Sequence, residues 1–383
     1  MILHADCVEA MRGMSENSID AIVTDPPYHL SFMGRSWDKA SPTDSQAMHE
    51  VWAREGLRLL KPGGHLLAFG GTRTYHRLAC GIEDAGFEIR DSLMWIHGQG
   101  FPKSKNVALL IDKAAGHPNR GRAIPAASTH FPTGRYVEEK LTSNPVEEYE
   151  ARTAEGEAWK GWGTALKPAH EPIVMARKPL SGTTVKNVLA HGVGPINVDG
   201  CRVGSEERVN TPAGNKPGEG SALYMSDYGM PTDTTGRTVR GRWPANVILD
   251  EAAAIELDAQ SGSGRSRKGK PRVGVKGDGW GMSATGAEYD DRGGASRFFY
   301  CAKAGRKERG AENKHPTVKP LALMRWLVRL VTPPGGLVLD PFAGSGTTGL
   351  AAIREGFEFI GIEREPDYVA TARSRISQVL VRS

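Results

Sequence analysis

The chain has 383 residues and a formal net charge of +5 at pH 7, so it can bury a sizeable core, and its mild basicity permits a nucleic-acid partner. Its four cysteines are scattered without a Cys-x-x-Cys pair, so neither a disulfide framework nor a zinc site is expected. There is no signal-peptide pattern and no apolar run of about 18 residues, which predicts a cytoplasmic protein without a metal or a membrane partner.

The first informative segment lies close to the N-terminus. The apolar run 20–23 predicts a buried strand that stops abruptly at the motif Asp25-Pro26-Pro27-Tyr28. In parallel sheets, ligands bind at the carboxyl ends of the strands, where this motif would lie. A Pro-rich turn with an incidental acid would explain the motif equally well if it stood alone.

The motif suits one chemistry, the methylation of an exocyclic amine on a nucleobase. Such an amine is a poor nucleophile because its lone pair is delocalised into the ring. The Asp25 carboxylate and the Pro26 carbonyl can accept its two N–H bonds and return the lone pair to the nitrogen. Pro26 and Pro27 stiffen the loop, and Tyr28 offers a flat face for a base taken out of the stack.

Strand and helix patterns alternate over the first 110 residues. A helix ending at 62–64 precedes a strand at 65–69, and a helix at 75–85 precedes a strand at 87–97. This alternation predicts an α/β fold with a parallel, doubly wound sheet. Residues 112–163 are Ala-, Gly-, Glu- and Arg-rich and are interpreted as an insertion.

The middle of the chain is turn-rich, with strand-like pieces at 242–249 and 297–301. Twelve Lys or Arg residues against five acids in 262–309 give a local excess larger than that of the whole chain. Such a stretch is expected to contact DNA phosphates, although a solvated disordered loop would have the same composition. The predicted DNA contacts are Arg265, Arg267, Lys268 and Lys270.

A Gly-rich turn follows the strand predicted at 337–339. Gly344 and Gly346 allow a close approach to a ligand, and the next strand, 359–362, ends in Glu363. An acid about 20 residues after a Gly-rich turn is the Rossmann arrangement for binding ribose hydroxyls. No Lys follows Gly346, which disfavours a phosphate-binding P-loop. A merely structural βαβ unit is the alternative.

Three segments together resemble the DNA amino-methyltransferases that use S-adenosylmethionine: 25–28, 315–320 (His-Pro-Thr-Val-Lys-Pro) and 340–347 (Asp-Pro-Phe-Ala-Gly-Ser-Gly-Thr). The catalytic motif precedes the cofactor motif, as in the β class of that family. The resemblance covers both ends of the chain, and the middle has no comparable signature.

The resemblance implies a doubly wound Rossmann-like methyltransferase sheet with an antiparallel terminal hairpin, whose arms would be Leu93–Ile96 and Ile173–Ala176, and an inserted Gly-rich target-recognition region. The implied domains are a catalytic half (1–111), an insertion (112–163), a return strand (164–180), a target-recognition region (181–295) and a cofactor-binding half (296–383).

The resemblance also implies the cofactor site. Thr317 and Lys319 would touch the methionine carboxylate of S-adenosylmethionine, and Asp6 would lie on its adenine side, with Ala5 in place of the usual Gly. The full set of implied cofactor contacts is Asp6, Cys7, Asp25, Thr317, Lys319, Asp340, Pro341, Phe342, Gly344, Ser345, Gly346, Thr347 and Glu363.

These features predict a site-specific methyltransferase acting on adenine N6 in double-stranded DNA. Cytosine N4 is the second choice, and a non-catalytic DNA-binding protein that holds the cofactor is a third. A homodimer and a cognate restriction endonuclease are conceivable partners. His170 and Glu171 are interpreted as structural, because amine methylation needs no strong general base.

Overall fold

A computed structural model describes most of the chain, as two compact units. The larger unit comprises residues 1–98 and 170–383, and the smaller comprises 99–169. The residues that the structure describes are 1–30, 41–98, 104–117, 150–210, 237–266, 291–303 and 318–380.

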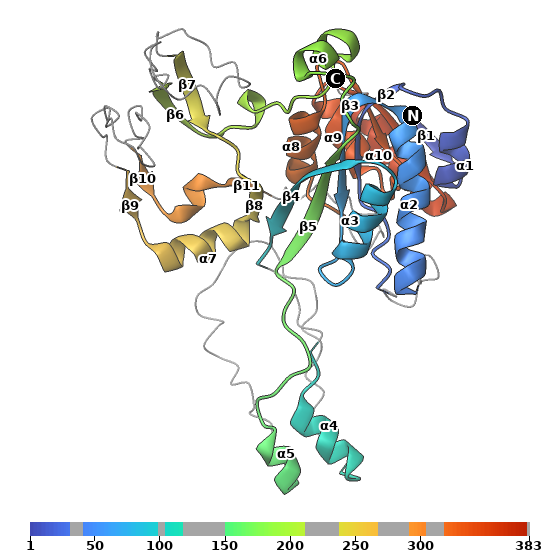
Figure 1. The fold of residues 1–383 in the computed structure, drawn as a ribbon. Helices are drawn as coiled ribbons and strands as arrows, with labels where there is room; N and C mark the ends of the chain where they lie inside the picture. The colour runs from blue at the N-terminus through green and yellow to red at the C-terminus, as the bar shows by residue number, and fades with distance from the viewer. Residues whose placement is uncertain are drawn as a thin grey trace, which may run out of the picture. The chain divides into compact units, whose positions relative to one another are not determined.

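The larger unit is built on a nine-stranded sheet (Figure 1). Neighbouring strands are parallel except for the two pairs that include β5, which runs opposite to the others. In spatial order the strands are β1 (Ile2–His4), β13 (Glu358–Glu363), β12 (Leu337–Asp340), β2 (Ile19–Thr24), β3 (Leu60–Phe69), β5 (His170–Arg177), β4 (Glu88–Ile96), β8 (Val247–Asp250) and β11 (Tyr300–Ala302).

Helices cover both faces of this sheet. Along β2, Ile22 packs in the cluster beneath α1, α2 and α3, whereas Ala21 and Val23 pack in the cluster beneath α8, α9 and α10 (Figure 1). Burial on both faces explains why β2 contains the apolar run 21–23, and the predicted doubly wound α/β fold is confirmed. These helices are α1 (Cys7–Arg12), α2 (Pro42–Leu59), α3 (Tyr75–Asp84), α8 (Leu321–Val331), α9 (Thr347–Arg354) and α10 (Pro366–Leu380).

The antiparallel hairpin forms from the two predicted arms, but the sheet does not end there. Leu93 on β4 pairs with Ile173 on β5, as expected. Beyond β4 the sheet continues with β8 and β11, both parallel to it. The reason is that Ile248 and Leu249 of β8 are buried apolar residues, and β8 pairs with the otherwise open edge of β4.

Part of the predicted target-recognition region is therefore integral to the main sheet and its core. Cys201 is buried against α8, and its carbonyl accepts a hydrogen bond from Trp326 Nε1 (3.3 Å). The remaining elements of this region are α6 (Thr184–His191), η4 (Asp199–Cys201), β6 (Val203–Asn210), β7 (Arg237–Arg242), α7 (Glu251–Ser261), β9 (Gly264–Arg265), β10 (Arg292–Gly293) and η5 (Ala295–Phe298).

The smaller unit contains α4 (Val107–Ala114) and α5 (Ala154–Ala158). Buried Asp112 on α4 accepts hydrogen bonds from the amides of Arg152 and Thr153 (2.8 and 3.1 Å), which join the two helices. The unit begins at 99, whereas the predicted insertion begins at 112, because α4 packs with α5. Among the described helices of either unit, none is long and apolar enough to cross a membrane.

Candidate active site

The strand order of the sheet reverses its direction between the neighbouring strands β12 and β2. The strand after β12, β13, lies on one side, and the strand after β2, β3, lies on the other. In open α/β sheets, ligands bind at such a switch point, outside the carboxyl ends of the strands. The predicted catalytic motif and the Gly-rich turn follow these two strands directly, so the fold brings both to one edge of the sheet.

Asp340, the last residue of β12, ties the two strand ends together. Its carboxylate accepts hydrogen bonds from Thr24 Oγ1 (2.6 Å), Thr348 Oγ1 (2.6 Å) and the Phe342 amide (3.1 Å). Burial raises the pKa of Asp340 to about 6, although these hydrogen bonds oppose the rise. Both oxygens are thus engaged within the chain, where they fix the start of the Gly-rich turn.

The Gly-rich turn has the backbone geometry that its glycines predict. Gly344 and Gly346 have φ angles of 49° and 80°, in the left-handed region that favours glycine. A Cβ on Gly346 would also lie 2.9 Å from the Cβ of Ala372 on α10. Gly346 is therefore required by packing as well as by backbone conformation.

Helix α10 also holds the polar side of this turn. Arg375 Nη1 donates to the carbonyl and hydroxyl oxygens of Ser345 (2.6 and 2.8 Å) and to Thr347 Oγ1 (3.1 Å). On the other side of the turn, Phe342 makes an edge contact with Trp52, with ring centroids 5.6 Å apart. Pro341 lies between Asp340 and this anchored phenyl ring in the sequence.

Two acids end neighbouring strands beside the turn. Glu363 accepts hydrogen bonds from the amides of Gly344 and Glu365, both at 2.8 Å. Asp6 follows β1, which pairs with β13, and its carboxylate caps α1. Burial, followed by the charge of Asp6, raises the pKa of the Cys7 thiol to about 12, so Cys7 is neutral near neutral pH.

Two side-chain hydrogen bonds anchor the predicted catalytic loop to the rest of the fold. Thr74 Oγ1 donates to the Tyr28 carbonyl (2.8 Å). His29, at a φ of 54° that non-glycine residues seldom adopt, shares a 2.7 Å hydrogen bond between its Nδ1 and Ser45 Oγ. These contacts fix the position of the Tyr28 ring relative to the sheet.

Asp25 and Tyr28 meet two further ionisable residues in one buried cluster. Lys319 Nζ lies 2.6 Å from Asp25 Oδ2 and 3.1 Å from Glu171 Oε2. The Tyr28 hydroxyl lies 2.9 Å from Asp25 Oδ1, 2.8 Å from Glu171 Oε2 and 3.1 Å from Lys319 Nζ. We call these four residues the catalytic cluster.

The protonation equilibria of the catalytic cluster are displaced in different directions. Burial, reinforced by Glu171, raises the pKa of Asp25 against the opposing charge of Lys319. Burial would also raise the pKa of Glu171, but the nearby ammonium of Lys319 lowers it overall. Burial opposes the charge on Lys319, yet the two carboxylates raise its pKa. The pKa of Tyr28 is raised well above its ordinary range by burial and both acids.

The structure adds contacts that the sequence did not indicate. Lys319, predicted to touch the methionine carboxylate of the cofactor, contacts Asp25 and Glu171, and Thr317 lies outside the described residues. Glu171, interpreted as structural, belongs to the catalytic cluster. The signal that could have found Glu171 is its place at the start of an antiparallel strand, because such a start lies at the same edge as the ends of parallel strands.

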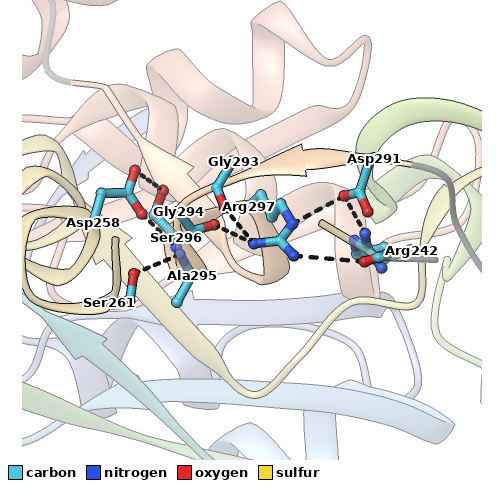
Figure 2. A network of polar contacts seen from close by, with 10 residues as sticks. Arg242, Asp258, Ser261, Asp291, Gly293, Gly294, Ala295, Ser296 and Arg297 are labelled. Atoms are coloured by element: carbon cyan, nitrogen blue, oxygen red, sulfur yellow. Dashed lines mark hydrogen bonds and ion pairs between the residues drawn. The ribbon is translucent and has the colours of Figure 1, made fainter. Parts of the chain in front are cut away.

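A second cluster of polar contacts lies in the predicted target-recognition region (Figure 2). Asp291 accepts hydrogen bonds from Arg242 and, at 3.1 Å, from Arg297 Nε. Burial opposes the charge on Asp291, but hydrogen bonds from Arg242 and Ser266 and the two guanidinium charges lower its pKa to about 2. We call Asp291, Arg242 and Arg297 the arginine staple.

The arginine staple is flanked by contacts that fix the elements around residues 267–290. Asp258 on α7 accepts hydrogen bonds from the Ser296 amide (2.8 Å) and hydroxyl (2.7 Å) (Figure 2). Arg265 on β9 pairs with Arg292 on β10 in an antiparallel ladder. The other predicted DNA contacts, Arg267, Lys268 and Lys270, lie outside the described residues.

A family model described as DNA methylase matches residues 19–374, nearly the whole chain. The chain belongs to this DNA methylase family. Its members methylate the N6 or N4 amines of DNA bases with S-adenosylmethionine, so the predicted resemblance and the predicted cofactor are confirmed. Within the described residues of this DNA methylase, there is no group of three or more His, Cys, Asp or Glu side chains that could hold a metal ion.

A relative that matches over nearly its full length shares only a low sequence identity with this chain. The chain is 23% identical to the type II methyltransferase M.HindIII of Haemophilus influenzae, over 98% of this chain and 94% of the relative. It is 49% identical to the type II methyltransferase M2.DpnII of Streptococcus pneumoniae, over 16% of this chain and 24% of the relative. Similar solved structures include the M1.HpyAVI–SAM complex (18% identical, 98% of both chains, TM-score 0.43) and the cytosine-N4-specific PvuII DNA methyltransferase (14% identical, 100% and 91%, TM-score 0.45).

The residues around the Gly-rich turn fit the adenosine part of the cofactor. Glu363 accepts backbone N–H bonds from Gly344, Arg364 and Glu365, and because a carboxylate has about four lone pairs, one is left that a ribose hydroxyl can use. Asp6 adds a second acid at the adjoining strand end. At the methionine end, the Lys319 ammonium contacts the other three residues of the catalytic cluster, and its predicted contact with the cofactor stays a prediction.

Proposed function

We propose that this DNA methylase methylates the N6 amine of an adenine at a specific site in double-stranded DNA. The observation that carries the proposal is the Asp25 carboxylate, which follows β2 at the switch point and lies partly buried beside Tyr28. Asp at this position, rather than Ser, favours adenine over cytosine among the methyltransferases that the chain resembles.

The chain's own residues would prepare the target amine. The Asp25 carboxylate and the Pro26 carbonyl accept its two N–H bonds and localise the lone pair on the nitrogen. Pro26 and Pro27 fix the backbone between the carboxylate and the aromatic ring. When bound, S-adenosylmethionine supplies an electrophilic methyl group.

Tyr28 would bind the target base rather than react with it. A base cannot present its amine to Asp25 from within a duplex, so it must be flipped out of the stack. The Tyr28 ring, anchored through Thr74 and the cluster contacts of its hydroxyl, provides a fixed stacking surface. Stacking on an aromatic side chain contributes about 1–3 kcal/mol per base.

The proposal is tested on DNA from cells that express the protein, by nucleoside mass spectrometry and methylation-sensitive sequencing. We expect N6-methyladenine at one recurring sequence. N4-methylcytosine would replace the adenine assignment, and no new methylated base would overturn both. Asp25→Ala is expected to retain less than about a tenth of the wild-type turnover while S-adenosylmethionine affinity is largely kept; a more active variant would remove Asp25 from its role.

The proposal carries further predictions about partners and location. Phosphate contacts are expected from the basic stretch 262–309, and sequence reading from residues 181–261. A DNA substrate would place the protein in the cytoplasm. A second copy of the chain and a cognate restriction endonuclease remain predicted partners, which co-purification and sizing of the expressed protein would test.

A further inference from the structure

With both carboxyl groups ionised, the catalytic cluster has fewer polar hydrogens than polar contacts. Five polar contacts of 3.1 Å or less join Asp25, Tyr28, Glu171 and Lys319. Each needs one hydrogen between its two heavy atoms. With both carboxyl groups ionised, the hydrogens come from the ammonium, which has three, and from the phenol, which has one. One contact is then left without a hydrogen.

The unsatisfied contact can be located. The three hydrogens of Lys319 account for its contacts with Asp25 Oδ2, Glu171 Oε2 and the Tyr28 oxygen. The single Tyr28 hydrogen can serve either Glu171 Oε2 at 2.8 Å or Asp25 Oδ1 at 2.9 Å. The remaining oxygen pair would repel at that distance unless a carboxyl oxygen carries a hydrogen of its own.

We propose that Asp25 holds this fifth hydrogen on Oδ1 in the ligand-free protein, and that Glu171 is the positioning residue that keeps it there. Asp25 Oδ1–H then donates to the Tyr28 oxygen, and the Tyr28 hydroxyl donates to Glu171. Glu171 Oε2 already has Lys319 as a donor, whereas Tyr28 is the one donor to Asp25 Oδ1 among the residues that the structure describes. All five contacts are satisfied in this arrangement.

The surroundings favour the same arrangement. With Asp25 neutral, the cluster holds one ammonium and one carboxylate, so no net charge is buried. The Lys319 ammonium also lies 4.7 Å from the centre of the Phe69 ring, an environment with little water.

Among the residues that the structure describes, charged groups act on the cluster from four segments. From β5, Glu171 raises the pKa of Asp25, and from the segment before α8, Lys319 lowers it. From the end of β12, Asp340 carries a carboxyl that Asp25 affects in turn. After β4, His97 acts on Glu171. The raised pKa of Asp25 and the lowered pKa of Glu171 agree with a proton on Asp25.

The consequence for catalysis rests on the proposed function. An ionised Asp25 can accept an N–H of the target amine with either oxygen, whereas a protonated one offers a donor at Oδ1 and repels that N–H. Loss of the fifth proton should therefore define the acidic limb of kcat/KM. Glu171→Gln removes a negative charge and should move that limb to lower pH. Lys319→Met removes a positive charge and should move it to higher pH.

The proton itself is tested without turnover. Infrared spectra of the ligand-free protein at neutral pH should contain the carbonyl band of a protonated carboxyl group, and Asp25→Asn should abolish it. In Glu171→Gln the band should titrate away at a lower pH. If the band is missing from the wild type, or is lost in Glu171→Gln but kept in Asp25→Asn, the assignment to Asp25 is overturned.

The pH profiles of methyl transfer give the second arm. The acidic limb is expected to move by about one pH unit or more, downward in Glu171→Gln and upward in Lys319→Met. Glu88→Gln is the matched control, because Glu88 pairs with Arg177 at the opposite end of β5. The acidic limb of its pH profile should coincide with that of the wild type. If Lys319→Met does not fold, Glu171→Gln decides alone. Unmoved limbs would overturn the role of Glu171, whereas a protonated Asp25 in a protein that methylates nothing would overturn the proposed function instead.

Discussion

The catalytic cluster and the arginine staple are built with opposite charge ratios. The catalytic cluster places two carboxyl groups around one ammonium, whereas the staple places two guanidinium groups around one carboxylate. The pKa of Asp25 is raised, first by burial and then by Glu171, whereas that of Asp291 is lowered to about 2 although burial opposes this. A second carboxylate therefore adds to the effect of burial in one cluster, and a second cation helps to overcome it in the other.

The difference in charge ratio corresponds to different roles that we expect for the catalytic cluster and the arginine staple. At the catalytic end, the proton that we propose on Asp25 would have to leave before the carboxylate accepts an N–H of the target amine. In the predicted target-recognition region, a carboxylate that stays ionised holds β7, β10 and η5 together at all ordinary pH values. The same types of residue therefore provide adjustable chemistry in one place and fixed structure in the other.

The largest predicted contrast is between Asp291→Ala and Asp25→Ala. Removing Asp291 leaves two poorly hydrated guanidinium groups together, so the free energy of unfolding should fall by about 3–5 kcal/mol. Removing Asp25 leaves the neutral pair of Glu171 and Lys319, so stability should be unchanged within about 1 kcal/mol or should rise. Urea unfolding of both variants measures the contrast.

A surface ion pair provides the control for this contrast. Glu365 pairs with Arg364 at 3.5 Å, and their side chains are 45% and 58% exposed. Glu365→Ala should therefore cost no more than about 1 kcal/mol. Equal losses in the Asp291 and Asp25 variants would show that charge ratio does not distinguish the two clusters.

Asp340 offers a pH-dependent test at the catalytic end. Its pKa in the folded protein, about 6, lies above the ordinary value of 3.8. Its carboxyl group therefore contributes stability that is full below a pH of about 4 and is lost as pH rises through 6, an effect of about 3 kcal/mol. The difference in unfolding free energy between wild type and Asp340→Asn, measured across this range, should fall with pH; a constant difference would contradict the raised pKa.

Glu363→Gln is expected to change the affinity for the cofactor only, by a free energy smaller than that predicted for Asp291→Ala. Loss of a charge-assisted hydrogen bond to ribose should weaken S-adenosylmethionine binding about ten- to a hundred-fold, by about 1.5–3 kcal/mol. Glu355→Gln is the control, because Glu355 pairs with Arg325 and Arg329 away from the turn. Calorimetry that finds equal affinity in wild type and Glu363→Gln would remove Glu363 from the site. Gly346→Val is unsuitable as a test, since its side chain would collide with α10.

The smallest effect per residue is expected for the basic stretch beside the arginine staple. Each lost phosphate contact should reduce the log–log salt slope of DNA binding by about 0.9. A combined neutralisation should reduce it by up to about 3–4, with cofactor affinity unchanged. A triple variant of Arg12, Arg54 and Arg90 is the control. An unaltered slope would place the DNA-binding surface elsewhere. The residues to neutralise together are Arg265, Arg267, Lys268 and Lys270.

The sequence by itself determined the elements whose signal is local. The continuous apolar run of β2 and the acid that follows it, the glycines of the turn and the acid that ends β13 are all readable within about 30 residues. Periodicity, turn chemistry and strand-end position depend on near neighbours in the chain, which is why Asp25, Gly346 and Glu363 could be placed at one sheet edge before the fold was known.

The tertiary structure decided which of these residues meet. Lys319 contacts Asp25 across 294 residues of sequence, and Glu171 contacts Tyr28 across 143. Such contacts depend on the sheet order and on the reversed direction of β5, neither of which a local pattern encodes. The same holds for β8 and β11, whose short apolar runs join the main sheet because the edge of β4 needs backbone partners there.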